Sequence, residues 1–208
     1  MEEFSMANVV RNIKNTALEH AHLPAEVATK LFEKEAMILY LTADHASWVY
    51  HVPRYQMLCG DMGSYRFSGM TYEAQPTFPQ ALEHAVQHMQ RIVVNPATNH
   101  SRLSGGLVNW YANGDHYIGP HADDERDMIA CSPIVALSLG ATRRFVFTKK
   151  TSKSVHVDET AVARLELQVE DGDLLIMGGT TQRTHKHAVP KMARCCDPRI
   201  SITLRCFH

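Results

Sequence analysis

The sequence predicts a mainly β chain of the sandwich or jelly-roll type, with a few flanking helices in an α+β arrangement. Two observations lead to this fold class. After Ser104-Gly105-Gly106, apolar runs of strand length follow one another at close intervals. Turn signals such as Asp171-Gly172 and Gly178-Gly179 separate these runs. Many short strands joined by short turns are typical of a sandwich or jelly roll.

The N-terminal third of the chain is mixed in character. Residues 1–22 carry charges of both signs without a strong period, so we expect an extension that is partly helical. Pro24 is expected to open a helix through Glu35, because proline is tolerated in a first helical turn. Trp48–Val52 is expected as a strand that ends at Pro53, and residues 59–69 as a loop or hairpin.

The clearest helix prediction covers Pro79–Val94, where apolar residues recur on one face at helical spacing. These residues are Leu82, Ala85, Val86, Met89 and Val93. Beyond this helix, strands are expected at residues 107–111, 133–139, 145–148, 162–169, 173–177, 185–189 and 200–207. No internal repeat, linker or low-complexity tract interrupts the chain.

Length and composition favour a single globular domain. A chain of 208 residues buries one core but is short for two ordinary domains. Apolar content of 45% excludes a disordered chain, and a net charge of −1 gives no general attraction to nucleic acid. Five cysteines without a signal-like N-terminus favour reduced thiols and a nuclear or cytoplasmic location. No apolar run approaches the roughly 18 residues of a membrane span.

Two histidines and a carboxylate in the C-terminal half form a candidate metal-binding set. His121 and Asp123 are two residues apart, so on a strand their side chains point to the same face. The third ligand is His185 or His187, which share a face of one predicted strand, so spacing leaves the choice open. Such a set binds Fe(II) and leaves coordination positions free. Taken alone, His-x-Asp often occurs by chance, and thirteen histidines make each one weak evidence.

The segment Arg199–Arg205 has the alternation of a strand. Arg199, Ser201, Thr203 and Arg205 share one face, and aliphatic residues share the other. An inward arginine is costly unless it meets an anion, and a guanidinium matches a carboxylate in two-point contact. The simpler interpretation is that the arginines face solvent. Beside the candidate metal ligands, however, binding of a dicarboxylic keto acid is the better explanation.

A series of motifs recurs along the chain and identifies a resemblance. They are Asn109-x-Tyr111, His121-x-Asp123-Asp124-Glu125, Ser138-Leu139-Gly140-Ala141-x-Arg143, Gly172-Asp173-Leu174-Leu175, His187-x-Val189-Pro190 and Arg199-x5-Arg205. Upstream lie Val52-Pro53-Arg54, Gly60-Asp61 and Tyr65-Arg66-Phe67-Ser68-Gly69. In these motifs, from Leu31 to Phe207, the chain resembles the AlkB family of Fe(II)/2-oxoglutarate-dependent nucleic-acid dealkylases. The DNA-repair members of that family in animals are the most similar.

The resemblance implies a fold, a metal site and a cofactor site. It implies a double-stranded β-helix, with an extension at 1–24 and one dioxygenase domain at 25–208. Within this domain, residues 37–70 would form a nucleotide-recognition lid and residues 104–208 the jelly-roll core. The implied iron ligands are His121, Asp123 and His187, because His-x-Val-Pro falls on His187. The implied 2-oxoglutarate contacts are Arg199 and Tyr111 at the distal carboxylate, Asn109 and Arg205 at the proximal end, and Ser201 nearby.

The resemblance also implies substrate contacts. Phe67 would stack on a flipped base, with the ring of His121 on the opposite face. Asp124 or Glu125 would meet the base edge or orient Arg205. The same lid would include Tyr65, Ser68 and Arg54.

The implied reaction is oxidative removal of N-alkyl groups from DNA or RNA, as in DNA repair or RNA demethylation. It uses Fe(II), 2-oxoglutarate and O2, and it releases formaldehyde, succinate and CO2. Cationic lesions such as 1-methyladenine and 3-methylcytosine would suit the site, because cationic rings stack well on an aromatic face. The expected partner is nucleic acid and not a membrane, and the expected state is a monomer.

Two departures from the family pattern qualify these expectations. Ser201 stands where the family often has Asn, so a cofactor contact there is expected to be weaker or water-bridged. At residues 43–47 the DNA-repair members carry a hairpin with an apolar wedge, whereas this chain has no large apolar residue there. Such wedges fill the gap that an extruded base leaves in a duplex. We therefore expect a preference for single strands.

Basic residues cluster after the Ser138 motif, at Arg143, Arg144, Lys149, Lys150 and Lys153. A patch of this kind, with Lys186 and Lys191 added, would contact phosphates without reading sequence. A solvated turn is an equally good explanation of a short charge run.

Three other functions are compatible with parts of this pattern. The first is a 2-oxoglutarate oxygenase that acts on a protein or a small molecule. The second is a non-catalytic module that recognises modified bases, although such a module has no need of three iron ligands. The third is a structural zinc protein, although zinc prefers a closed tetrahedral site.

Overall fold

The structure is a computed structural model, and it describes residues 8–10, 37–41, 47–51, 53–67, 70–93, 102–150 and 163–208. Two antiparallel sheets make up most of the described chain. Within the described residues, no helix is long and apolar enough to span a membrane.

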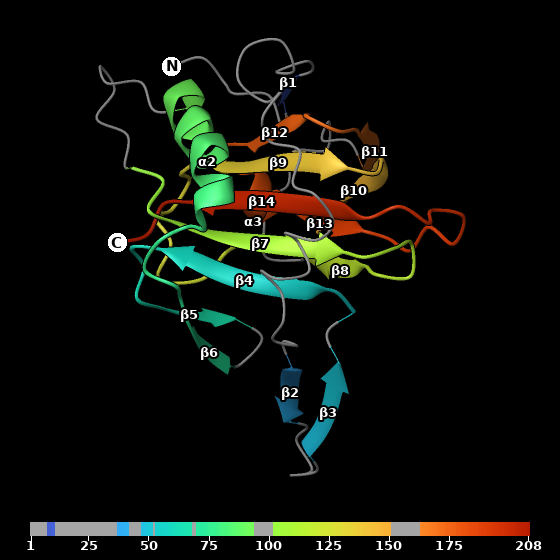
Figure 1. Cartoon of the computed structure of the whole chain (residues 1–208), viewed down its shortest axis with the longest axis horizontal. Coiled ribbons are helices and arrows are strands. Elements are labelled where there is room, and N and C mark those ends of the chain that lie inside the picture. The colour runs from blue at the N-terminus through green and yellow to red at the C-terminus, as the bar shows by residue number, and fades with distance from the viewer. Residues whose placement is uncertain are drawn as a thin grey trace.

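The larger sheet has six strands in the order β1-β12-β9-β14-β7-β4 (Figure 1). Their bounds are Asn8–Val10 (β1), Leu174–Met177 (β12), Ile134–Gly140 (β9), Arg199–Arg205 (β14), Gly105–Tyr111 (β7) and Tyr55–Gly60 (β4). Every neighbouring pair is antiparallel. Strand β14 pairs with β7 along its whole length and with β9 along most of it, and all of its residues are buried. This central strand carries both candidate cofactor arginines.

The smaller sheet has the order β11-β10-β13-β8 and is also antiparallel. Its strands are Arg164–Val169 (β11), Arg143–Lys149 (β10), His185–Val189 (β13) and Ile118–His121 (β8). The register of β13 and β8 places His187 directly opposite His121. Two candidate metal ligands therefore face each other on neighbouring strands.

The remaining elements are two hairpins and two helices. Strands β2 (Met37–Leu41) and β3 (Ser47–His51) form one hairpin, and β5 (Ser64–Phe67) and β6 (Met70–Glu73) form the other. Helix α2 covers Gln80–Val93, and α3 is the single turn Thr181–Thr184 immediately before β13. The β2–β3 hairpin extends beyond the β4 edge of the larger sheet (Figure 1).

Two apolar layers hold these elements together. The first lies between the sheets, where Ile134 and Leu175 of the larger sheet pack with Phe145, Phe147 and Val189 of the smaller. The second lies on the outer face of the larger sheet, which α2 crosses (Figure 1). This second layer contains Leu82, Ala85, Val86 and Met89 of the helix and Val108, Leu137, Ile200, Ile202 and Leu204 of the sheet.

The observed strands confirm the predicted β class. Helix α2 confirms the helix predicted at Pro79–Val94. The architecture, mainly β with few helices and antiparallel sheets, is consistent with a double-stranded β-helix. The alternation predicted for residues 199–205 is also confirmed, since Ile200, Ile202 and Leu204 face α2. Of the segment expected as a loop or hairpin, residues 59–60 end β4 and residues 64–67 form β5, which pairs with β6.

Five strands were not predicted. They are β1, β2, β4, β6 and β8. The expected helix from Pro24 through Glu35 and most of the wedge position at 43–47 lie outside the described residues. Strand β1 lies within residues 1–22, which were expected to form a partly helical extension. It pairs with β12 at the edge of the larger sheet.

Candidate active site

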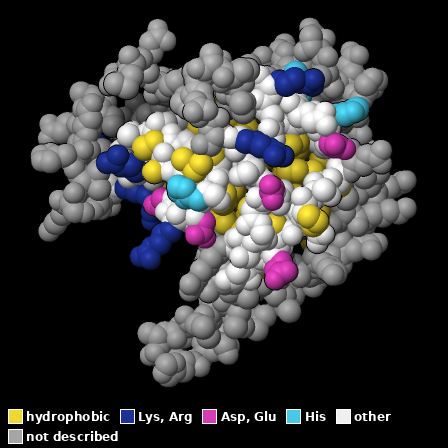
Figure 2. Space-filling model, turned by 90° about the vertical axis from the view of Figure 1, so that its left-hand side faces the viewer, with side chains coloured by type: hydrophobic (Ala, Val, Ile, Leu, Met, Phe, Trp, Pro, Cys, Tyr) yellow, Lys and Arg dark blue, Asp and Glu magenta, His cyan; other side chains and the backbone are white. Residues whose placement is uncertain are grey.

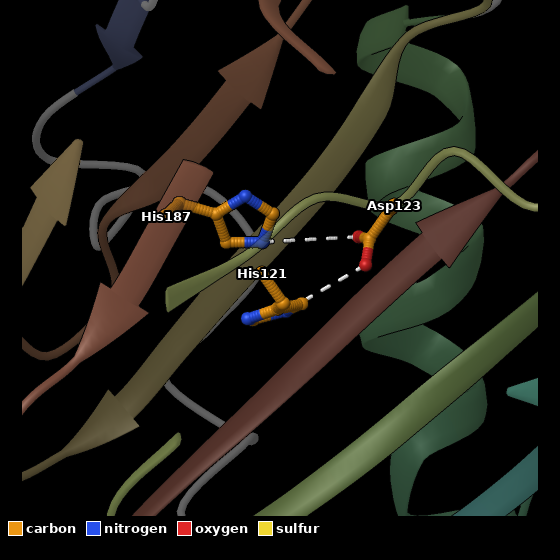
Figure 3. A group of neighbouring side chains, drawn as sticks. All are labelled: His121, Asp123 and His187. Atoms are coloured by element: carbon orange, nitrogen blue, oxygen red, sulfur yellow. Dashed lines mark ion pairs between the residues drawn. The ribbon is translucent and has the colours of Figure 1, made fainter. Parts of the chain in front are cut away.

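Three potential metal ligands converge between the two sheets (Figure 3). His121 ends β8, His187 lies in β13, and Asp123 follows two residues after the end of β8. Their ligand atoms all lie within 4.8 Å of one another. The Nε2 atom of His121 is 3.6 Å from Oδ1 of Asp123, and Nε2 of His187 is 3.9 Å from Oδ2. The choice that spacing left open is thereby made in favour of His187, because His185 is not part of this group.

The two imidazole rings are held by different contacts. Nδ1 of His121 lies 2.9 Å from the carbonyl oxygen of Gly119, a bond in which the ring donates. With its proton on Nδ1, His121 keeps the lone pair of Nε2 available to a metal. The ring of His187 stacks on Phe145, with centroids 5.5 Å apart and planes 9° apart. Both rings are therefore oriented by the protein itself.

The protonation states suit a divalent cation. Burial lowers the pKa of His187 to about 4 and also lowers the pKa of His121, so both imidazoles are neutral near neutral pH. Burial alone would raise the pKa of Asp123, but the charge of Arg205 and its hydrogen bonds to the carboxylate hold the pKa well below its ordinary value. Neutral imidazoles and an ionised carboxylate are the donor forms that a metal binds. Two such histidines with one carboxylate fit Fe(II).

Asp123 is positioned through both its side chain and its backbone. Arg205 donates to Oδ2 of Asp123 from Nη2 at 2.7 Å and from Nε at 3.2 Å. The backbone N–H of Asp123 donates to Oε1 of Gln182 at 3.0 Å. The expectation that one strand carries both His121 and Asp123 is wrong for Asp123, because β8 ends at His121. Sequence reasoning missed Gln182, since a single glutamine on one helical turn carries no motif.

A second group of polar residues lies on β14 and its neighbours. Arg199 is 3% exposed, and its Nε donates to Oγ of Ser138 at 2.9 Å. Its guanidinium lies 5.3 Å from the centroid of the Tyr111 ring. Its Nη1 atom is buried and has no hydrogen-bond partner among the described residues. A buried guanidinium nitrogen without an acceptor is costly, so a bound anion such as a carboxylate fits this position.

The residues expected at the proximal end of the cofactor lie on the same strands. Asn109 of β7 pairs in register with Ser201 of β14, and both are buried. Oδ1 of Asn109 accepts a hydrogen bond from Nε of Arg54 at 2.8 Å. Arg54 is itself buried and directly precedes β4. The structure thus brings Arg54 to a predicted cofactor residue, whereas its predicted contact with substrate stays a prediction.

The other lid residues are placed to different degrees. Tyr65 is 3% exposed, hydrogen-bonds Glu125 and packs edge-on against Phe207 at 5.4 Å between ring centroids. Burial raises the pKa of Glu125, and the nearby Asp123 adds to this effect. Asp124 is exposed and forms an ion pair with Lys150 at 2.9 Å.

Two residues of the predicted lid, Phe67 and Ser68, lie partly or wholly outside the described part of the chain. Phe67 ends β5, but its side chain lies outside the described atoms, as does all of Ser68. Stacking by Phe67 therefore stays a prediction.

The expected basic patch is wrong for Arg143. This residue is 1% exposed, and its guanidinium donates to the carbonyl oxygens of Asn113, His116 and Pro190 at 2.7–3.2 Å. The pleat of β10 explains the burial, because Arg143 shares its inward face with Phe145 and Phe147. Of the other members, Arg144 pairs with Glu166 and Lys150 pairs with Asp124. Lys153 lies outside the described residues.

None of the five cysteines is paired in a disulfide; Cys59 and Cys206 are buried, and Cys131 and Cys196 are exposed. The reduced state expected from the sequence stays a prediction.

Three side chains that fit Fe(II), together with a buried arginine that fits a carboxylate, are the features of one class of protein, the 2-oxoglutarate-dependent iron oxygenases. The sequence profile described as the 2OG-Fe(II) oxygenase superfamily matches residues 18–205. The DNA oxidative demethylase ALKBH2 of Mus musculus is 36% identical over 186 residues, which cover 86% of this chain and 74% of that protein. The chain belongs to the 2OG-Fe(II) oxygenase superfamily and, within it, to the AlkB family.

Further relatives agree with this assignment. ALKBH2 of Bos taurus is 37% identical over 158 residues, covering 74% of this chain and 53% of that protein. The alpha-ketoglutarate-dependent dioxygenase alkB homolog 3 of Homo sapiens is 33% identical over 159 residues, covering 76% and 53%. The chain thus spans only about half the length of these two relatives. The solved structure of OsALKBH1 matches with a TM-score of 0.51 at 19% identity, covering 85% of this chain and 87% of that one, which supports the fold alone.

Proposed function

We propose that this chain removes N-alkyl groups from bases in DNA or RNA by Fe(II)- and 2-oxoglutarate-dependent oxidation. The observation that carries the proposal is the presence, in one interior, of the metal group His121, Asp123 and His187 and of a buried arginine, Arg199, whose Nη1 has no partner among the described residues. Metal ligands and an anion site between the same two sheets fit a chelating keto acid. The choice of nucleic acid rests on the relatives, two of which are named DNA oxidative demethylase.

Each part of the site has a separate task in this proposal. His121, Asp123 and His187 hold the iron, and Arg205 keeps Asp123 ionised and in place. Arg199, steadied by Ser138 and Tyr111, binds the distal carboxylate of 2-oxoglutarate. When bound, iron, 2-oxoglutarate and O2 supply an oxidation that places one oxygen atom in succinate, releases CO2 and hydroxylates the N-methyl carbon, which leaves as formaldehyde.

The residues around the metal group suit a cationic base. Asp124 is exposed beside the metal ligands, and Glu125 lies against Tyr65 of the β5–β6 hairpin. A carboxylate near the base edge favours a positively charged ring such as 1-methyladenine or 3-methylcytosine. Phe67, at the end of the same hairpin, is proposed to stack on that ring.

We propose a preference for single strands. The support is the lack of a large apolar residue at 43–47, which leaves no wedge to fill a duplex after base extrusion. On the face seen in Figure 2, acidic side chains are interspersed among the Lys and Arg side chains, and the net charge of the chain is −1. A higher rate on a duplex than on the same single strand would contradict this preference.

The test is release of formaldehyde and succinate from a single-stranded oligonucleotide that contains 1-methyladenine, with Fe(II), 2-oxoglutarate and O2. The wild-type chain is expected to form both products in equal amounts, and His187→Ala to form neither. Succinate without formaldehyde would redirect the proposal to the other candidate, an oxygenase of the same class that acts on a protein or small molecule. Absence of succinate from a protein shown to contain iron would refute the enzymatic proposal.

A further inference from the structure

Arg54 is buried although it lies within the segment expected to recognise nucleotides. Its side chain is 8% exposed, and its Nε donates to Oδ1 of Asn109 at 2.8 Å. Its Nη1 lies 3.4 Å from the carbonyl oxygen of Tyr117, in the loop before β8. The guanidinium is thus directed into the protein, toward β7.

This contact determines which way the amide of Asn109 faces. A guanidinium has donors only, so the amide atom that meets it at 2.8 Å must be the oxygen. The amide nitrogen, with its two donors, is consequently the atom left for other partners. Asn109 is 5% exposed and lies opposite Ser201, on the strand pair that also carries Tyr111 and Arg199.

The orientation matters for a keto acid. Carboxylate and keto oxygens accept hydrogen bonds, so a cofactor pocket must offer donors to them. An Asn109 amide turned the other way would present its oxygen and repel the cofactor.

We propose that Arg54 is a positioning residue for 2-oxoglutarate, which it serves by holding the Asn109 amide with its NH2 group toward the proximal end of the cofactor. The proposal rests on the proposed function, in which Asn109 contacts that cofactor. In this role Arg54, which directly precedes β4, acts on the cofactor site and not on the nucleic acid. Loss of Arg54 should then weaken 2-oxoglutarate binding in the absence of any oligonucleotide.

The experiment measures the Kd of 2-oxoglutarate for the full chain loaded with Mn(II), by calorimetry without turnover. Arg54→Met keeps the length of the apolar stem and removes the donors. It is expected to weaken binding about tenfold, the effect of one lost hydrogen bond to a polar group. Arg54→Lys is expected to restore part of the loss, because an ammonium group can still donate to Oδ1 of Asn109. Arg144→Met, at the exposed arginine that pairs with Glu166, is the matched control and should leave the Kd unchanged.

A double-mutant cycle shows whether Arg54 acts through Asn109. In an Asn109→Ala background, Arg54→Met is expected to have no further effect on the Kd, because the amide that it orients is gone. Additive losses would overturn the proposal, as would an unchanged Kd in Arg54→Met. Should Arg54→Met fail to fold, Arg54→Leu, which also lacks a donor, takes its place with the same expected loss.

Steady-state kinetics separate this role from a substrate contact. The KM for 2-oxoglutarate is expected to rise in Arg54→Met while the KM for the oligonucleotide stays constant. The reverse pattern would assign Arg54 to the nucleic acid and overturn the proposal. The binding measurement does not depend on the oligonucleotide. If no alkylated oligonucleotide reacted, the proposed function would be refuted. The comparison of Kd values would still decide the role of Arg54. A wild-type chain that does not bind 2-oxoglutarate would overturn both.

Discussion

Arg205 directs both of its hydrogen bonds with Asp123 to one carboxylate oxygen, Oδ2, from Nη2 at 2.7 Å and from Nε at 3.2 Å. The other oxygen, Oδ1, is the one nearer to His121, at 3.6 Å. Arg205 ends the central strand of the larger sheet, whereas Asp123 follows the edge strand of the smaller one. A single ion pair therefore joins the two sheets and leaves one carboxylate oxygen for a metal.

Removal of Arg205 is expected to destabilise the metal-free protein. Both partners of the pair are about 5% exposed, so Arg205→Met would leave Asp123 as a buried charge without a counter-ion. The free energy of unfolding should fall by about 3 kcal/mol, as when one partner of a buried pair is lost. Lys150→Met breaks the neighbouring exposed pair with Asp124 and should cost less than about 1 kcal/mol. Urea unfolding without metal measures both, and equal losses would contradict the role given to Arg205.

The two histidines of β13 should differ sharply in metal binding. His185 and His187 are both buried on the same strand, but only His187 lies opposite His121 and within the ligand group. His187→Ala is expected to weaken Fe(II) or Co(II) binding at least a hundredfold and to change the Co(II) absorption spectrum. His185→Ala should leave the spectrum unchanged, although it can lower stability through its contact with Thr184 at 2.8 Å. Loss of metal in both variants would make the register argument wrong.

Gln182 is expected to act on the metal through the backbone of Asp123. Its Oε1 accepts the N–H of Asp123 at 3.0 Å, and it lies on α3, just before the strand that carries His187. Gln182→Ala should weaken metal binding roughly tenfold, in the range found for groups that orient a ligand. Arg183→Ala, at the exposed neighbour on the same turn, serves as the control. A Co(II) titration that gave one affinity for wild type and both variants would show that the hydrogen bond does not position Asp123.

The buried thiol of Cys59 predicts a loss of stability at alkaline pH. Burial raises the pKa of Cys59 from 9.0 to about 12, and the side chain is 0% exposed. Between these pH values the unfolded chain loses the thiol proton and the folded chain keeps it. The free energy of unfolding therefore falls as the pH rises above 9, by at most about 1.4 kcal/mol per pH unit, with no contribution from this group at lower pH.

Cys59→Ala removes this contribution, whatever it does to stability at neutral pH. The slope of unfolding free energy against pH, from urea unfolding between about pH 8 and pH 11, should be shallower in the variant than in wild type. Parallel slopes would mean that the thiol of Cys59 ionises over the same pH range in the folded and the unfolded chain, which would contradict the prediction.

The sequence predicted those features that depend on local periodicity. The alternation from Arg199 to Arg205 predicted a strand with a polar and an apolar face, and the structure has β14 there, with Ile202 against α2. The spacing of Leu82 and Met89 likewise predicted α2 and its buried face. In both elements a period of 2.0 or 3.6 residues is visible within the segment itself.

The features that sequence reasoning missed depend on contacts between distant segments. Strand β8 reads Ile-Gly-Pro-His, which has no alternation and contains proline, yet it forms because β13 offers an edge to pair with. Gln182 lies in no motif, and its role follows only from the approach of α3 to Asp123. Spacing could not choose between His185 and His187 for the same reason, since the register with β8 decides it.

Arg143 shows why charge alone misleads, and it yields the last prediction. Its neighbour Arg144 is partly exposed and pairs with Glu166, whereas Arg143 donates to the carbonyl oxygens of Asn113, His116 and Pro190. These bonds join the loop before β8 to the end of β13. Arg143→Met is expected to lower the free energy of unfolding by about 3 kcal/mol, because it removes three hydrogen bonds from a buried charged group to partly buried carbonyl oxygens. Arg144→Met should change it by less than about 0.5 kcal/mol.

For nucleic-acid binding the expectation is reversed: Arg144→Met should have an effect and Arg143→Met should have none. Of the two arginines, only Arg144 is exposed enough to contact phosphates. Arg144→Met is therefore expected to reduce the salt dependence of oligonucleotide binding, whereas Arg143→Met is not. The slope of log Kd against log salt concentration should fall by about 1. Urea unfolding and a salt titration of binding, run on both variants, give two independent readings. If Arg143→Met were as stable as wild type and showed a reduced salt slope, Arg143 would have to be exposed, which would contradict its assignment to the interior.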